Sequence, residues 1–179
     1  MDKSGQAWSV PVAVDDIPET GLHMEIEAPA TARAELAQVT GLRDLPRLSA
    51  VFDLTRKGAG VHVCGRVSAR AGQTCVVTLE PVENAVEELV DLEFAPTSGP
   101  EPEAKGPRKR MVADDELPEP LVGGVVDLGA LAAEFLILGI DPYPRKAGAE
   151  FAAPRQEDAS EHPFAALESL KKSLGGRQK

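Results

Sequence analysis

Alternating apolar and polar residues predict most of the strands in this chain. In residues 21–28, Leu22, Met24 and Ile26 alternate with polar side chains, which is the period of a half-buried β-strand. The segment 69–72 (ARAG) reads as a turn, so it predicts a hairpin between the runs that flank it. We therefore expect a mainly antiparallel sheet of about six strands, at 7–14, 21–28, 48–55, 61–68, 73–79 and 86–94.

Apolar residues at three- and four-residue spacing predict two helices that pack on this sheet. The first covers 31–39, with Thr31 as its N-cap and Gly41 just beyond its end. The second begins after Asp127, a natural N-cap, and stops at Gly139. Sheet and helices together predict the α+β class. The expected buried faces are Ala32, Leu36 and Val39 in the first helix, and Leu128, Leu131, Ala132, Phe135 and Leu138 in the second.

Two polar stretches set the expected limits of the domain. Residues 96–120 contain six prolines and almost no apolar side chains, which predicts a disordered insert. Residues 151–179 predict a flexible tail, in which 163–174 has the apolar spacing of one short helix. We therefore expect one α+β domain over 1–150, interrupted by the insert.

The charge balance limits the expected partners. The chain has 19 Lys and Arg against 29 Asp and Glu, a net charge of −10, which disfavours unaided binding to a phosphate backbone. A basic protein partner remains open. The apolar stretch 121–140 contains Asp127 and Glu134, so we interpret it as a soluble strand and helix, with no membrane contact. Because the start of the chain also lacks a secretory signal, we expect a cytoplasmic protein.

The residues give little support to catalysis or metal binding. Motifs typical of nucleotide-binding loops, zinc proteases and serine hydrolases are missing from the sequence, so we expect no catalytic residue, no cofactor and no small-molecule substrate. Cys64 and Cys75 lack the paired spacing of metal ligands. The predicted hairpin places Cys75 opposite Ser68 and Cys64 opposite Leu79, about 13 Å apart along the strand, which is too far for a disulfide. We expect both cysteines to be small buried side chains.

Two groups of residues are candidates for partner binding. Arg66 shares one strand face with His62, and Arg70 lies near the predicted turn, which suggests a modest anion-binding stripe; the alternative is an ordinary solvated sheet face. The second group is Asp141, Tyr143 and Arg145, in a segment that two prolines keep extended. Tyr and Arg are frequent binding anchors. The alternative is that this segment is a structural clamp that runs back over the sheet.

Two stretches of the sequence resemble one known family. Val126–Gly129 with Glu134, leading to Asp141–Arg145, is similar to the C-terminal signature of the YceD family of large ribosomal RNA subunit accumulation proteins. Gln73–Pro81, preceded by 61–69, is similar to the central signature of that family. The resemblance covers roughly residues 8–150.

This resemblance implies a cytoplasmic, non-enzymatic factor in ribosome biogenesis, needed for the synthesis, processing or stability of large-subunit ribosomal RNA. The implied partner is a ribosomal RNA precursor, or a ribosomal or biogenesis protein. The alternative is a protein-interaction adaptor that makes no RNA contact. Many members carry a second cysteine in a Cys-x-x-Cys-like arrangement, whereas Val77 and Thr78 follow Cys75 here, so no metal or redox role carries over.

Overall fold

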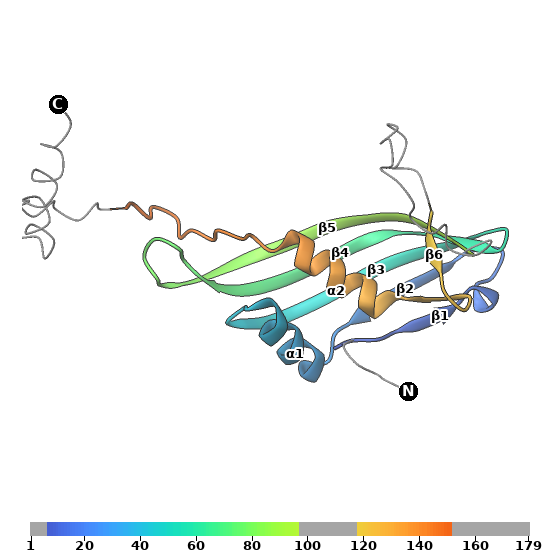
Figure 1. The fold of residues 1–179 in the computed structure, drawn as a ribbon, viewed down its shortest axis with the longest axis horizontal. Helices are drawn as coiled ribbons and strands as arrows, with labels where there is room; N and C mark the ends of the chain where they lie inside the picture. The colour runs from blue at the N-terminus through green and yellow to red at the C-terminus, as the bar shows by residue number, and fades with distance from the viewer. Residues whose placement is uncertain (1–6, 97–117, 152–179) are drawn as a thin grey trace, which may run out of the picture. The chain divides into compact units, whose positions relative to one another are not determined.

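The main element of the fold is a five-stranded sheet in the order β2-β3-β4-β5-β6 (Figure 1). The computed structural model describes residues 7–96 and 118–151. Four of the strands are antiparallel neighbours, and the short β6 pairs with β5 in parallel. The strands are β2 (Leu22–Glu27), β3 (Asp44–Lys57), β4 (Gly60–Thr74), β5 (Pro81–Pro96) and β6 (Glu119–Leu121).

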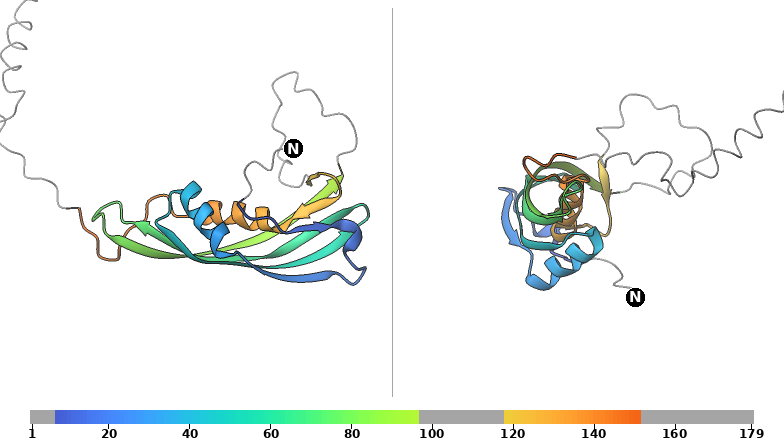
Figure 2. Two further views of the ribbon diagram at one scale, coloured as in Figure 1. Left: turned by 90° about the horizontal axis from the view of Figure 1, so that it is seen from below. Right: turned by 90° about the vertical axis from the view of Figure 1, so that its left-hand side faces the viewer.

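Two helices and a second, two-stranded sheet complete the described structure. Strand β1 (Pro11–Ala13) pairs with β7 (Val125–Asp127), and a 3-10 turn (Val14–Asp16) follows β1. The helices α1 (Ala30–Thr40) and α2 (Leu128–Gly139) lie on the same face of the large sheet (Figure 2). The predicted α+β class is confirmed, although the strands divide into two sheets and not one. None of the helices among the described residues has the length and apolarity that crossing a membrane requires.

The core is aliphatic and lies between the helices and one face of the large sheet. Along β4, Val61, Val63, Val67 and Ala69 are buried on the covered face of the sheet. Phe52 on β3 is fully buried among them. The alternate residues His62, Cys64, Arg66 and Ser68 reach the other face, which the helices leave open. The period-2 pattern therefore assigns these faces correctly.

The first helix begins and ends close to its predicted bounds but differs in its cap. It starts at Ala30, the N-cap position is Pro29, and no side chain caps it, so the prediction of Thr31 as N-cap is wrong. Gly41 ends it in the left-handed conformation (φ 71°), as predicted. The side chain of Val39 is 78% exposed, because the helix turns Leu36 and Ala37 toward the sheet.

Asp127 is confirmed as the N-cap of the second helix. Its Oδ1 accepts hydrogen bonds from the backbone N–H groups of Gly129 and Ala130, both at 3.1 Å. The helix includes Gly139, one residue more than predicted. The expected burial of Leu138 is wrong: that side chain is 70% exposed, and Leu136 is buried in its place.

The predicted hairpin around residues 69–72 is wrong. Strand β4 continues through this segment to Thr74 and pairs along its whole length with β5, so the turn lies at 75–80. Buried positions continue to alternate with other positions at Ala69, Ala71 and Gln73. The small side chains of this segment fit in the sheet, so the strand is not broken.

The predicted register of the two cysteines is wrong for the same reason. Cys64 lies between Asp53 and Asp91 and is only half-buried, whereas Cys75 is buried in the turn, and both are free thiols.

The predicted bounds of the insert are too wide. Pro96 is the last residue of β5, and Glu119 and Pro120 belong to β6. The rest of the predicted insert, and the predicted tail from residue 152 with its helix at 163–174, lie outside the described residues. Contacts divide the chain into Met1–Ala147 and Gly148–Lys179, and the sites below belong to the first unit.

Candidate partner-binding site

One end of the large sheet brings together two segments that are far apart in the sequence. The loop Cys75–Glu80 joins β4 to β5, and the segment Asp141–Lys146 follows α2 and lies against that loop (Figure 1). We call these two segments the tip.

Backbone and amide hydrogen bonds fix the later segment on the sheet. The N–H of Val76 donates to the carbonyl of Pro144 at 2.9 Å. Gln73 Nε2 donates to the carbonyl of Asp141 at 2.8 Å, and Gln73 Oε1 accepts from Asn84 Nδ2 at 2.8 Å. Gln73 is buried, so its amide has lost its contact with water. The two hydrogen bonds replace that hydration and avoid the free-energy cost of an unsatisfied buried amide. The segment is therefore held in one position.

The thiol of Cys75 forms a second link between the two segments. Its Sγ accepts the backbone N–H of Lys146 at 3.3 Å and that of Thr78 at 3.4 Å. These donors, Lys146 first, lower the pKa of the thiol to about 6, although burial acts in the opposite direction. The sulfur is thus a hydrogen-bond acceptor inside the tip, where Cys75 is a free thiol.

An ion pair closes the tip on its outer side. Lys146 Nζ donates to Glu80 Oε2 at 2.8 Å. This bond lowers the pKa of Glu80 and raises that of Lys146, because each charge stabilises the other. The pair is half-exposed, so its contribution to stability is small beside that of the buried amide network.

The predicted site residues Asp141, Tyr143 and Arg145 lie together on this fixed segment. Asp141 Oδ1 accepts the N–H of Tyr143 at 2.8 Å, which sets a tight turn over Pro142. The side chain of Tyr143 is 71% exposed while Pro144 beside it is buried. Arg145 is exposed and has no carboxylate partner among the described residues. A clamp in which Tyr143 packs on the sheet does not fit this exposure.

Two further exposed apolar side chains in the tip were missed by the sequence analysis. Val76 is 45% exposed and Leu79 is 77% exposed. Leu79 also has a positive φ of 59°, which is uncommon for a leucine and costs about 1 kcal/mol or more. Both residues fall in the predicted strand 73–79. The signal that marks them as a loop is Pro81, because proline is suited to the first position of a strand.

The other predicted residues, Arg66 and Arg70, lie apart from these. They occupy the open face of β4, whereas Gln73, which binds Asp141, belongs to the covered face. Arg66 pairs with Glu87 at 3.1 Å and Arg70 with Glu83 at 3.0 Å. Each arginine of the predicted stripe therefore already has an anionic partner within the protein, and so does His62, with Asp91 at 2.6 Å.

The described residues contain no group of three His, Cys, Asp or Glu side chains placed to hold a metal ion. At the tip, Thr78 donates its N–H to Cys75 from the position that a Cys-x-x-Cys pair would give to its second cysteine. The tip is thus held by N–H donors and one ion pair.

Comparison with known proteins gives one family match. The family model described as Large ribosomal RNA subunit accumulation protein YceD matches residues 63–171. The matched range is more than half of the chain and includes both segments of the tip. No curated protein and no solved structure matches the chain.

Proposed function

Because the chain belongs to the YceD family, which is named for accumulation of the large ribosomal RNA subunit, we propose that it acts as a non-enzymatic factor in ribosome biogenesis. In this role it supports the synthesis, processing or stability of large-subunit ribosomal RNA in the cytoplasm. The tip is the surface that contacts its partner, which is the ribosomal RNA precursor or a protein assembled on it.

The family match carries the proposed function, and the observation that supports the tip as its contact surface is the exposed pair Tyr143 and Arg145 on a segment that is already fixed. Pro144 between them is buried, and its carbonyl is bonded to the β4–β5 loop. A segment held in this way loses little conformational entropy when a partner binds, so the contact energy of its side chains is retained as affinity. The exposed Leu79 and Val76 add an apolar surface beside them.

A second candidate function is that of an adaptor that binds only a basic protein. The net charge of −10 favours it, since a polyanion is repelled by such a chain at long range. The pairing of Arg66 and Arg70 with glutamates favours it too.

The double variant Tyr143→Ala, Arg145→Ala tests the role of the tip. We expect it to impair accumulation of large-subunit RNA in cells while its free energy of unfolding changes by no more than about 0.5 kcal/mol, because both side chains are exposed. A denaturation curve and a complementation test in a strain that lacks the protein measure the two effects.

The conservative double variant Tyr143→Phe, Arg145→Lys is the matched control, since it keeps an aromatic ring and a positive charge at the same places. We expect it to complement at least in part. A stable alanine variant that complements fully would remove the tip from the proposal, and a variant destabilised by about 2 kcal/mol or more would show a structural role instead.

A further inference from the structure

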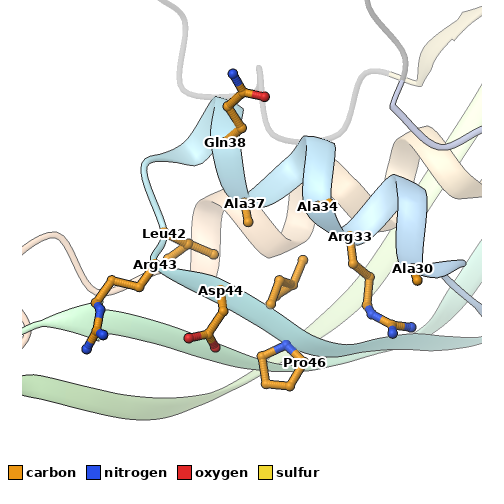
Figure 3. A pocket seen from close by; sticks show the side chains of 10 residues that line it. Ala30, Arg33, Ala34, Ala37, Gln38, Leu42, Arg43, Asp44 and Pro46 are labelled. Carbon is orange, nitrogen blue, oxygen red and sulfur yellow. The ribbon is translucent and has the colours of Figure 1, made fainter.

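A groove that contains two arginines lies between α1 and the start of β3, and none of its lining residues belongs to the tip. It has a volume of about 510 Å³ (Figure 3). Its apolar lining includes Ala34, Ala37, Leu45 and Pro46, and Arg33 and Arg43 lie along it with Asp44. The family match begins at residue 63, so this part of the chain is outside it.

The two arginines differ from most other positive charges of the described structure. Five lysines and arginines of the described ranges 7–96 and 118–151 pair with a carboxylate: Arg56, Lys57, Arg66, Arg70 and Lys146. Neither Arg33 nor Arg43 has such a partner within these ranges. An arginine presents five N–H donors in a planar fork, which suits an anion with several oxygens.

Both arginines are set on rigid backbone. Arg33 is half-buried on α1, and its Nη1 donates to the carbonyl of Ala28 at 2.7 Å, which orients the guanidinium and leaves its other donors available. The N–H of Arg43 donates to the carbonyl of Gly72 at 2.8 Å, directly after the turn at Gly41. The guanidinium of Arg33 and the backbone of Arg43 are therefore held in place, and the two side chains lie well apart along the groove in Figure 3.

The acidic residue of the groove, Asp44, faces the neighbouring strand. A Cβ placed on Gly72 would lie 2.5 Å from Asp44 Oδ1, so the carboxylate lies directly against the backbone of β4. Within the described part of the chain Asp44 forms no ion pair with Arg33 or Arg43, and its negative charge reduces the positive potential of the groove. Arg47, which follows Pro46 and is exposed, adds a further positive charge nearby.

From this arrangement we propose that the groove binds the phosphodiester backbone of single-stranded RNA. Arg33 and Arg43 each contact a phosphate, and the apolar floor between them receives the intervening sugar or base. Two separated cations joined by an apolar floor fit an extended polyanion better than a single small anion. In a chain of net charge −10 such a contact is weak and depends strongly on salt, which makes it an auxiliary contact beside the tip.

The test is titration of a fluorescein-labelled oligouridylate with the full chain, followed by fluorescence anisotropy at several salt concentrations. For two phosphate contacts on a single strand we expect log K to fall with log salt with a slope of about −1.4. The variant Arg33→Gln, Arg43→Gln should bind about five- to tenfold more weakly at low salt and lose most of that slope. Asp44→Asn should bind about twofold more tightly, because it removes a negative charge from the groove.

The control variant Arg56→Gln, Arg66→Gln removes the same number of charges from positions that already pair with carboxylates. We expect it to weaken binding by less than about twofold. Equal losses in the two double variants would overturn the proposal, since net charge alone would then explain binding. Absence of binding by the unmodified chain at low salt would overturn it too.

Thermal melts of all variants should coincide. Loss of the hydrogen bond from Arg33 to Ala28 could lower the melting temperature of the double variant. In that case the single variants Arg43→Gln and Asp44→Asn are compared instead, and we expect weaker RNA binding in the first and tighter RNA binding in the second. Tyr143 and Arg145 are unchanged in every variant of this assay, so equal losses in the two double variants would remove the groove and leave the Tyr143 and Arg145 experiment to decide the proposed function separately.

Discussion

Replacing Gly65 with alanine is expected to lower the free energy of unfolding by about 3 kcal/mol. Gly65 lies in β4 directly opposite Phe52 of β3, in the middle of the large sheet. A Cβ at this position would collide with the carbonyl oxygen of Val51 and would lie 2.9 Å from the ring of Phe52. Neither neighbour can move easily, because the first is strand backbone and the second is fully buried.

A urea denaturation curve of Gly65→Ala measures this loss. Ser68→Ala is a suitable control, since Ser68 lies on the open face of the same strand and its substitution should change stability by less than about 0.5 kcal/mol. A loss of less than about 1 kcal/mol in the glycine variant would mean that β3 and β4 separate locally, contrary to the close pairing described here.

The second large effect is expected at Asp127, where alanine should cost about 2 kcal/mol of stability. This carboxylate caps α2 and also binds the segment before β1, accepting from Val10 N at 2.8 Å and from Ser9 Oγ at 2.6 Å. Removing it leaves four donors without their acceptor and loosens the contact between α2 and the N-terminal strand.

The pH dependence of the same residue gives an independent check. Burial alone would raise the pKa of Asp127, but the hydrogen bonds from Ser9, Val10, Ala130 and Gly129 together lower it below its ordinary value of 3.8. A carboxyl with a lowered pKa in the folded state stabilises the fold above its unfolded pKa and loses this contribution as the pH falls through the folded value.

Asp127→Asn keeps the Oδ1 acceptor and removes the charge. We therefore expect its stability to lie between those of the original chain and Asp127→Ala at neutral pH. The difference between the original chain and the asparagine variant should shrink as the pH falls below 3.8. A difference that is constant across this range would show that the charge of Asp127 contributes nothing.

Local signals in the sequence were enough to predict the elements whose ends depend on one or two residues. The cap at Asp127 and the left-handed Gly41 both act within a single helical turn, so they can be identified without knowledge of the fold. The turn at 69–72 was misplaced because its alanines and glycine also fit a close-packed strand, and the choice depends on pairing with β5. The register in which two strands pair depends on residues that are far apart in the sequence, so a local pattern does not determine it.

The candidate site likewise has features that a local sequence pattern predicts and features that depend on contacts between distant residues. The two prolines around Tyr143 predict a stiff, extended segment. The segment is held in one position, but a tight turn at Pro142 and Tyr143 replaces the expected extended course there, because Asp141 accepts the N–H of Tyr143. The bond from Lys146 N to Cys75 Sγ joins residues 71 positions apart, and no pattern in the chain indicates it. The sequence does not predict the groove of Arg33 and Arg43 either, since its lining depends on how α1 packs against the start of β3.

The ratio of large-subunit to small-subunit ribosomal RNA in a strain that lacks this chain tests the central claim most directly. The strain and its parent are grown at the same rate, and a plasmid that carries the unmodified chain provides the restored control. The account predicts a lowered ratio in the deletion strain and its recovery with the plasmid. An unchanged ratio at matched growth rate would contradict the proposed function.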